Sequence, residues 1–102
     1  MRIITEKRLK DWEKTHPKAA GYLEAWRKNV RLAAWRNLVE VRRTYPADSV
    51  KVASGRQVQV FNVCGNNYRL IVAVHFNRNP KVYILRFLTH AEYSKDRWKA
   101  EL

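Results

Sequence analysis

Apolar residues recur every three or four positions through the first half of the chain, which is the spacing of an amphipathic helix. The spacing is most regular after Pro17, a residue type favoured in the first turn of a helix. The stripe there consists of Ala19, Tyr22, Leu23, Trp26, Val30 and Ala33. Before this stripe, Thr5 is suited to cap the N-terminus of another helix, which ends near Thr15. A third helix is expected over residues 34–43, because Tyr45-Pro46 stops it there.

The period changes to two in the second half of the chain, which indicates β-strands. Residues 64–67 and 77–80 contain the Gly, Asn and Pro that favour tight turns. The alternating segments predict strands over residues 57–63, 68–76 and 82–88, with a short edge strand at residues 1–4. A three-stranded meander cannot bury itself, so helices must cover one face. The expected fold class is α+β, with N-terminal helices packed on one face of a small antiparallel sheet.

Alternation along the central strand separates a core face from a second face. The face expected to meet the helices carries Tyr68, Leu70, Val72, Val74 and Phe76. Arg69, Ile71, Ala73 and His75 share the other face, which is expected to open toward solvent. Arg86 joins Arg69 on that face in one register of the last strand and not in the next, because a slip of one residue reverses the faces.

The composition indicates one small domain over residues 1–102 with a modest core, since 46% of the 102 residues are hydrophobic. Cys64 is the only cysteine, which excludes an internal disulfide and suits a reducing compartment such as the cytosol. We find no apolar run long enough for a membrane span and no apolar core of a signal peptide in residues 1–30. One cysteine and three dispersed histidines predict no metal site.

The charge of the chain is strongly positive, with 21 Lys and Arg against 9 Asp and Glu, a net charge of +12. No acidic residue occurs from Ser49 to Ala91. That stretch contains Lys51, Arg56, Arg69, Arg78, Lys81 and Arg86. Unopposed positive charge attracts a polyanion, and in so small a domain it favours nucleic acid. A solvated basic surface and a docking patch for an acidic protein remain open as alternatives.

The segment Thr89-His90-Ala91-Glu92-Tyr93 follows the last predicted strand and carries the most chemically active side chains. Thr89 and Glu92 have the spacing of a capping box, which predicts a short helix. His90 and Tyr93 are three residues apart and face the same way on one helical turn. Taken alone, these residues are more often ordinary surface and packing residues. His75 is expected at the rim of the sheet and His16 at a helix boundary.

Arg, His, Tyr and Lys are suitable residue types for RNA cleavage without a metal ion. Attack of a 2′-hydroxyl on the adjacent phosphorus requires removal of a proton, and the leaving 5′-oxygen must receive one. The phosphorane gains negative charge that a guanidinium can stabilise. Arg titrates too high to exchange protons, so it is the electrostatic partner.

Two blocks of the sequence, residues 61–72 (FNVCGNNYRLIV) and 89–93 (THAEY), resemble the HigB toxins of bacterial toxin–antitoxin systems. Residues 35–38 and 45–50 also match the pattern of that family. The resemblance covers nearly the whole chain and implies a RelE-like fold. It also implies an mRNA interferase that acts on the translating ribosome without a cofactor. The implied partner is a HigA-type antitoxin with a helix-turn-helix domain. The toxin would be brought to operator DNA only as a complex with this antitoxin.

The resemblance implies active residues at Arg69, His90 and Tyr93, and it favours function over the packing interpretation for the last two. Lys51 and Arg86 extend this catalytic set through their basic character and expected position. The remaining cations of the acid-free stretch, Arg56, Arg78 and Lys81, are predicted to bind RNA. A non-catalytic module that binds RNA or DNA is the alternative, since binding needs only the charges and the aromatic residues.

Overall fold

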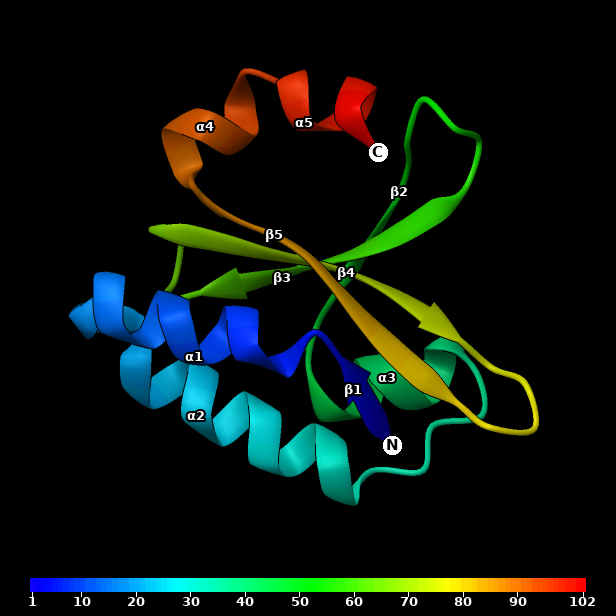
Figure 1. Ribbon diagram of the computed structural model, residues 1–102. Helices are drawn as coiled ribbons and strands as arrows, with labels where there is room; N and C mark the ends of the chain where they lie inside the picture. The colour runs from blue at the N-terminus through cyan, green and yellow to red at the C-terminus, as the bar shows by residue number, and fades with distance from the viewer.

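A computed structural model describes residues 1–102 and has an α+β fold built on a five-stranded sheet (Figure 1). The strands are β1 (Arg2–Ile4), β2 (Asp48–Lys51), β3 (Gln57–Val63), β4 (Tyr68–His75) and β5 (Lys81–Thr89). The helices are α1 (Glu6–Thr15), α2 (Pro17–Leu32), α3 (Leu38–Thr44), α4 (His90–Ser94) and α5 (Arg97–Glu101). The sheet order is β1-β5-β4-β3-β2, in which only β1 and β5 pair in parallel. The architecture is RelE-like, as expected.

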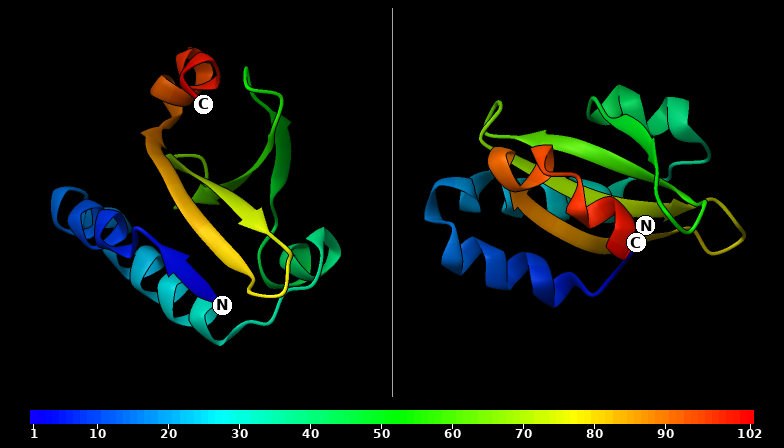
Figure 2. Two further views of the ribbon diagram at one scale, coloured as in Figure 1. Left: turned by 45° about the vertical axis from the view of Figure 1, so that its right-hand side comes forward. Right: turned by 90° about the horizontal axis from the view of Figure 1, so that it is seen from above.

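The N-terminal helices cover one face of the sheet, as the helical stripe predicts (Figure 2). Leu23, Trp26 and Val30 of α2 are fully buried in one hydrophobic cluster with Leu70 and Val72 of β4. Burying this many large apolar side chains is the main source of stability on that side. The core face inferred from alternation in β4 is therefore confirmed for Leu70 and Val72, which are buried, and for Tyr68 and Val74, which pack against the cluster. The prediction is wrong for Phe76, which lies beyond the end of the strand and is exposed.

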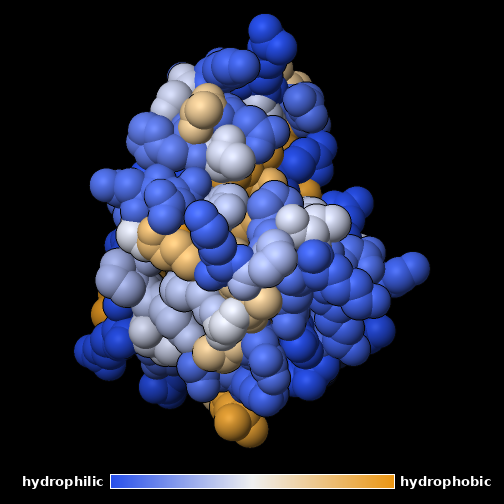
Figure 3. Space-filling model, turned by 90° about the vertical axis from the view of Figure 1, so that its left-hand side faces the viewer, coloured by the Kyte–Doolittle hydropathy of each residue, from blue (hydrophilic) through white to orange (hydrophobic).

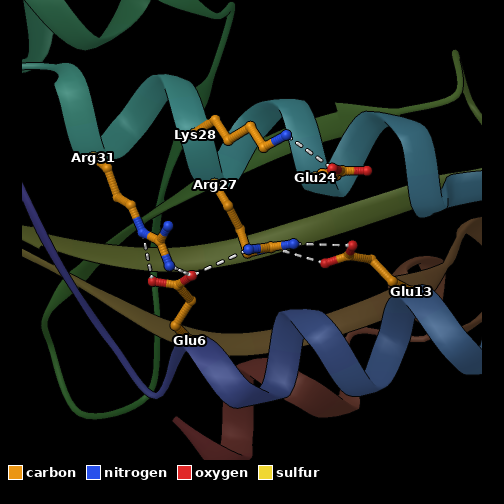
Figure 4. A network of polar contacts seen from close by, with 6 residues as sticks. All are labelled: Glu6, Glu13, Glu24, Arg27, Lys28 and Arg31. Atoms are coloured by element: carbon orange, nitrogen blue, oxygen red, sulfur yellow. Dashed lines mark hydrogen bonds and ion pairs between the residues drawn. The ribbon is translucent and has the colours of Figure 1, made fainter.

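Ion pairs join α1 to α2 on the outer side of this layer (Figure 4). The Arg27 guanidinium donates to both carboxylate oxygens of Glu13, at 2.9 and 3.2 Å, and to Glu6 at 3.2 Å. Arg31 also donates to Glu6. The hydrogen bonds to Glu13 raise the pKa of Arg27 above its ordinary value. Four of the six residues drawn in Figure 4 thus form one network that holds α1 against α2, namely Glu6, Glu13, Arg27 and Arg31.

The second face of the sheet is covered as well, which contradicts the expectation that it opens toward solvent. Ile71 is fully buried there and packs with Val58 and Val60 of β3. Trp98 of α5, only 2% exposed, closes this smaller cluster from above. The backbone N–H of Ala53, in the β2–β3 loop, donates to the Lys99 carbonyl oxygen at 2.9 Å. The C-terminal helices therefore form a second layer, as Figures 1 and 2 show.

Several element boundaries differ from those predicted. The third helix begins at Leu38 rather than residue 34, because Asn37 caps it by accepting from the Glu40 N–H at 3.1 Å. Thr5 occupies the N-cap of α1 with φ 67° and makes no side-chain capping bond. Strand β2 and helix α5 were not predicted from the sequence.

Candidate active site

The end of the sheet where β4 begins brings together Arg69, the β3–β4 turn and α4. Arg69 is only 8% exposed. Its Nη1 donates to the Tyr68 carbonyl oxygen at 3.0 Å, and its Nη2 donates to Asn66 Oδ1 at 3.3 Å. Its Cζ lies 5.4 Å from the centre of the Tyr93 ring, within the range of a cation–π contact. Arg69 is thus a positioned cation rather than a freely moving surface side chain.

The β3–β4 turn holds both halves of this arrangement. Cys64 (φ 53°) and Gly65 (φ 68°) adopt the left-handed conformation, which turns the chain tightly enough to aim Asn66 at Arg69. The carbonyl oxygen of the next residue, Asn67, accepts the backbone N–H of His90 at 3.0 Å. The first residue of α4 is therefore tied to the same turn that holds Arg69.

The capping box predicted for α4 is present. Thr89 Oγ1 accepts the Glu92 N–H at 3.2 Å, and Glu92 Oε1 accepts the Thr89 N–H at 3.0 Å. This reciprocal pair stabilises a helix of only five residues. The cap sets the direction in which His90, which is exposed, and Tyr93, which is half-buried, project from the helix.

Tyr93 is held by Trp98 as well as by Arg69. The two aromatic rings stack at 5.2 Å with an interplanar angle of 18°. The indole N–H of Trp98 donates to the Tyr93 carbonyl oxygen at 3.1 Å. With its ring committed to these contacts, Tyr93 offers chiefly its hydroxyl group to a ligand.

Arg86 lies on the same face as Arg69, because a β-bulge in β5 shifts the alternation. Ile71 pairs with Arg86 whereas Val72 pairs with Ile84, so Leu85 is the extra residue. Strict alternation would have placed Arg86 with Ile84 in the helix-covered core. Arg69 pairs with Leu88, two residues beyond Arg86, a diagonal separation of about 7–8 Å between Cα atoms.

The other predicted cations lie away from this end of the sheet. Lys51 pairs with Gln57 of β3, whereas Arg69 pairs with Asn62, five residues further along the same strand. Lys51 and Arg69 are therefore separated by about 17 Å along the strand direction. Lys51 is also exposed on the opposite face of the sheet. Arg56 is exposed in the β2–β3 loop, and Arg78 is exposed in the β4–β5 loop. Lys81 begins β5 opposite His75 at the far end of β4. The structure therefore groups Arg69, Arg86, His90 and Tyr93, and leaves these four outside.

Three residues of the site were missed by sequence reasoning. Asn66 was assigned only to the turn, and nothing in the pattern shows that its side chain holds Arg69. Trp98 lies in a basic tail whose packing the sequence does not reveal, although an isolated Trp among charged residues is itself a signal of burial. Arg8, on α1, donates to the carbonyl oxygens of Ile84 and Leu85 at 3.3 and 3.2 Å and so braces the bulge.

The surface around this end of the molecule is mainly hydrophilic, with small apolar areas between polar side chains (Figure 3). No three His, Cys, Asp or Glu side chains are grouped closely enough to hold a metal ion. None of the helices combines the length and apolar composition needed to cross a bilayer.

Comparison with known proteins identifies the family. A family model described as the HigB toxin, a RelE-like toxic component of a toxin–antitoxin system, matches residues 18–96. The chain is similar to the mRNA interferase toxin HigB of Escherichia coli K12 and to the mRNA interferase HigB of Shigella flexneri. Each is 31% identical over 94 residues, which cover 91% of this chain and 88% of the relative. The chain therefore belongs to the HigB toxin family of RelE-like toxins.

Proposed function

We propose that this toxin is an endoribonuclease that cleaves mRNA without a metal ion. The observation that carries the proposal is that a held guanidinium lies beside the short helix that carries a histidine and a tyrosine. Arg69 lies 5.4 Å from the Tyr93 ring, and His90 is tied to the turn that holds Arg69. The relatives named mRNA interferases support the same activity.

The proposed reaction is an internal transfer at phosphorus. The 2′-hydroxyl loses its proton, its oxygen attacks the adjacent phosphorus, and a phosphorane forms. The bond from phosphorus to the 5′-oxygen then breaks, and that oxygen takes up a proton. The products are a 2′,3′-cyclic phosphate and a 5′-hydroxyl. No water enters this step, so the protein needs to supply only proton transfer, charge stabilisation and positioning.

Arg69 stabilises the negative charge of the phosphorane in this proposal. Two of its five N–H donors are used by Tyr68 and Asn66, which leaves three for phosphate oxygens. His90, exposed on the first turn of α4, takes part in the proton transfer that the reaction requires. The Tyr93 hydroxyl donates to the phosphate or to the leaving oxygen. Arg86 assists from the neighbouring strand by binding the RNA backbone.

The cations outside the site are proposed to bind RNA elsewhere along the surface. Lys51, Arg56 and Arg78 are exposed, and they are too far from Arg69 to share one phosphate with it. Together with Lys81 they suit extended contact with backbone phosphates, including those of ribosomal RNA. We propose that the ribosome positions the mRNA, since so small a site contributes little positioning of its own.

The proposed partner is a HigA-type antitoxin with a helix-turn-helix domain, through which the pair would bind operator DNA. The toxin would act in the cytoplasm, where its mRNA substrate and a reducing environment for Cys64 are found.

The test is cleavage of one mRNA, naked and during translation in a reconstituted system, with analysis of the new ends. We expect cyclic phosphate ends in the presence of chelator, and loss of at least 100-fold in rate for Arg69→Gln, in line with the removal of one charge-stabilising group. Lys10→Gln, an equal charge change on α1, is the matched control. Intact RNA in both settings, or cleavage by Arg69→Gln at the rate of Lys10→Gln, would rule out the proposed mechanism.

The alternative function is a non-catalytic module that binds nucleic acid. The burial of Arg69 favours it, because a buried guanidinium with internal hydrogen bonds can stabilise the fold without taking part in catalysis. This alternative predicts unchanged growth arrest and intact mRNA for both His90→Gln and Tyr93→Phe. The catalytic proposal expects each variant to reduce cleavage while the circular dichroism spectrum stays unchanged.

A further inference from the structure

A pocket of about 210 Å³ lies beside Arg86, between β5 and the C-terminal helices. Leu88 and Trp98 provide its apolar part, and its charged rim consists of Arg86, Lys95, Arg97 and Glu101 together with the capping residue Glu92. The volume is below the roughly 300–1,000 Å³ of sites for drug-sized ligands. It therefore suits a small part of a polymer, such as one phosphate with its ribose.

The cations of this pocket are largely unpaired. Lys95 and Arg97 are exposed, and neither has a carboxylate partner within 4.0 Å. Arg86 has one, Glu101, but the distance from its Nη2 to Glu101 Oε2 is 3.6 Å. A charge-assisted hydrogen bond between these groups would measure about 2.7–2.9 Å. The side chains are also 33% and 58% exposed, so solvent screens the pair and it is easily exchanged.

We infer that this pocket is a subsite for the RNA phosphate that neighbours the cleaved one, and that Glu101 occupies Arg86 in its place when RNA is absent. A guanidinium binds carboxylate and phosphate through the same planar fork, so the phosphate can replace the carboxylate directly. Once Glu101 is displaced, a phosphate in the pocket meets the three cations Arg86, Lys95 and Arg97 against the single lining carboxylate of Glu92. Glu101 itself pairs with only one cation within 4.0 Å.

The spacing of the two arginines supports this division of roles. Arg69 and Arg86 lie on the same face of adjacent strands, about 7–8 Å apart at Cα. This separation is comparable to that of consecutive phosphates on one RNA strand. Arg69 then holds the phosphate that reacts, and Arg86 holds the next one. The subsite rests on the proposed function for its RNA ligand, but it concerns binding and can be tested without cleavage.

The experiment measures the affinity of a short single strand that cannot be cleaved because its 2′-hydroxyls are O-methylated. Glu101→Gln is compared with Glu24→Gln, which makes the same charge change at a similarly exposed ion pair on α2. We expect Glu101→Gln to bind about fivefold more tightly than wild type, and Glu24→Gln to bind as wild type does. Equal affinities for the two variants would overturn the inference, because only overall charge would then matter.

The cations are tested through the salt dependence of the same binding. Removing one phosphate contact from a single strand lowers the slope of log affinity against log salt by about 0.7. We expect this for Arg97→Gln and Arg86→Gln, and an unchanged slope for Lys10→Gln. Unchanged slopes for both arginine variants would also overturn the inference. So would inorganic phosphate that competes as strongly as the oligonucleotide, because the pocket would then be a free-anion site.

Cleavage of the matching unmodified strand separates this inference from the proposed function. If the Glu101 and Arg97 variants change affinity as expected but no strand is cut, the subsite stands and the ribonuclease proposal fails. If strands are cut while the Glu101 and Glu24 variants bind alike, the ribonuclease stands and the subsite fails.

Discussion

Replacing Trp98 with alanine tests whether the C-terminal helices are an integral layer of the fold. The Trp98 side chain is 2% exposed and closes the cluster that contains Val58, Val60 and Ile71. Burial of a tryptophan removes about 200 Å² from water, which corresponds to about 5 kcal/mol at 25 cal/mol per Å². Measured Trp→Ala changes in protein cores cost about 3–5 kcal/mol. Because α5 is short and can detach as a unit, we expect the lower end, about 3 kcal/mol.

A loss of about 3 kcal/mol is a large share of the 5–15 kcal/mol that stabilises a typical domain, and it would lower Tm by about 12–24 °C. Trp98→Phe keeps the stacking on Tyr93 and most of the burial but loses the hydrogen bond to the Tyr93 carbonyl, so about 1 kcal/mol is expected. Leu32→Ala, at a side chain that is 87% exposed, is the control and should change stability by less than about 0.5 kcal/mol.

The assay is urea denaturation followed by circular dichroism, combined with hydrogen exchange at one amide. The Ala53 N–H donates to the carbonyl oxygen of Lys99 in α5, so its protection reports directly on whether α5 is docked. We expect Trp98→Ala to lose this protection even where the sheet is intact. If Trp98→Ala is as stable as Leu32→Ala and the Ala53 amide stays protected, α5 is not held by Trp98 and the second layer has another origin.

Three further predictions concern the bulge, the helix pair and alkaline pH. Arg8→Gln should lower cleavage by loosening the bulge, and should lower it no further in a protein that already carries Arg86→Gln, as a double-mutant cycle would show. Arg27→Met leaves the Glu13 carboxylate largely buried without its partner, so urea denaturation should show a loss of about 2 kcal/mol. Burial raises the pKa of Tyr22 to about 12, so the phenol ionises first in the unfolded chain, near pH 10. The contribution of Tyr22 to the free energy of unfolding should therefore be fully present below pH 10 and be lost as the pH rises to 12. Tyr22→Phe should make the free energy of unfolding fall less steeply over this range.

Each of these predictions has an outcome that contradicts it. Additive losses in the double-mutant cycle would show that Arg8 does not act through Arg86. If Arg27→Met costs no more than Glu24→Gln, the pairing with Glu13 contributes nothing measurable. A Tyr22→Phe protein with the same alkaline decline as wild type would assign that decline to another group.

The sheet strands were predictable because their signals are local. Strand β3 has the bounds predicted, and β4 and β5 differ by one residue at their ends, since alternation and turn residues lie within each segment. Strand β2 carries the residues DSVK, which neither alternate clearly nor include large apolar side chains. It forms because β3 offers it a partner, and such long-range pairing leaves no pattern in so short a segment.

What covers the second face was not predictable from alternation. Alternation decides which residues share a face, but not which distant segment packs on it. Ile71 is apolar enough to require cover, and it packs in one cluster with Trp98, far along the chain. The same long-range packing buries Arg69, which alternation alone placed toward solvent.

The bulge in β5 shows in the spacing of the buried positions along the strand. Buried positions follow a spacing of two from Val82 to Ile84 and of three from Ile84 to Phe87, which breaks the strand period. If Leu85 were deleted, β5 would pair with β4 without a bulge, and Phe87 would still lie in the core. What Leu85 adds is an additional carbonyl oxygen, which accepts hydrogen bonds from Arg86 at 2.8 Å and from Arg8 at 3.2 Å. A bulged residue leaves its polar groups free of the ladder. The interruption therefore anchors a guanidinium on the face that carries Arg69, where the register of β5 already places Arg86 beside the candidate active site.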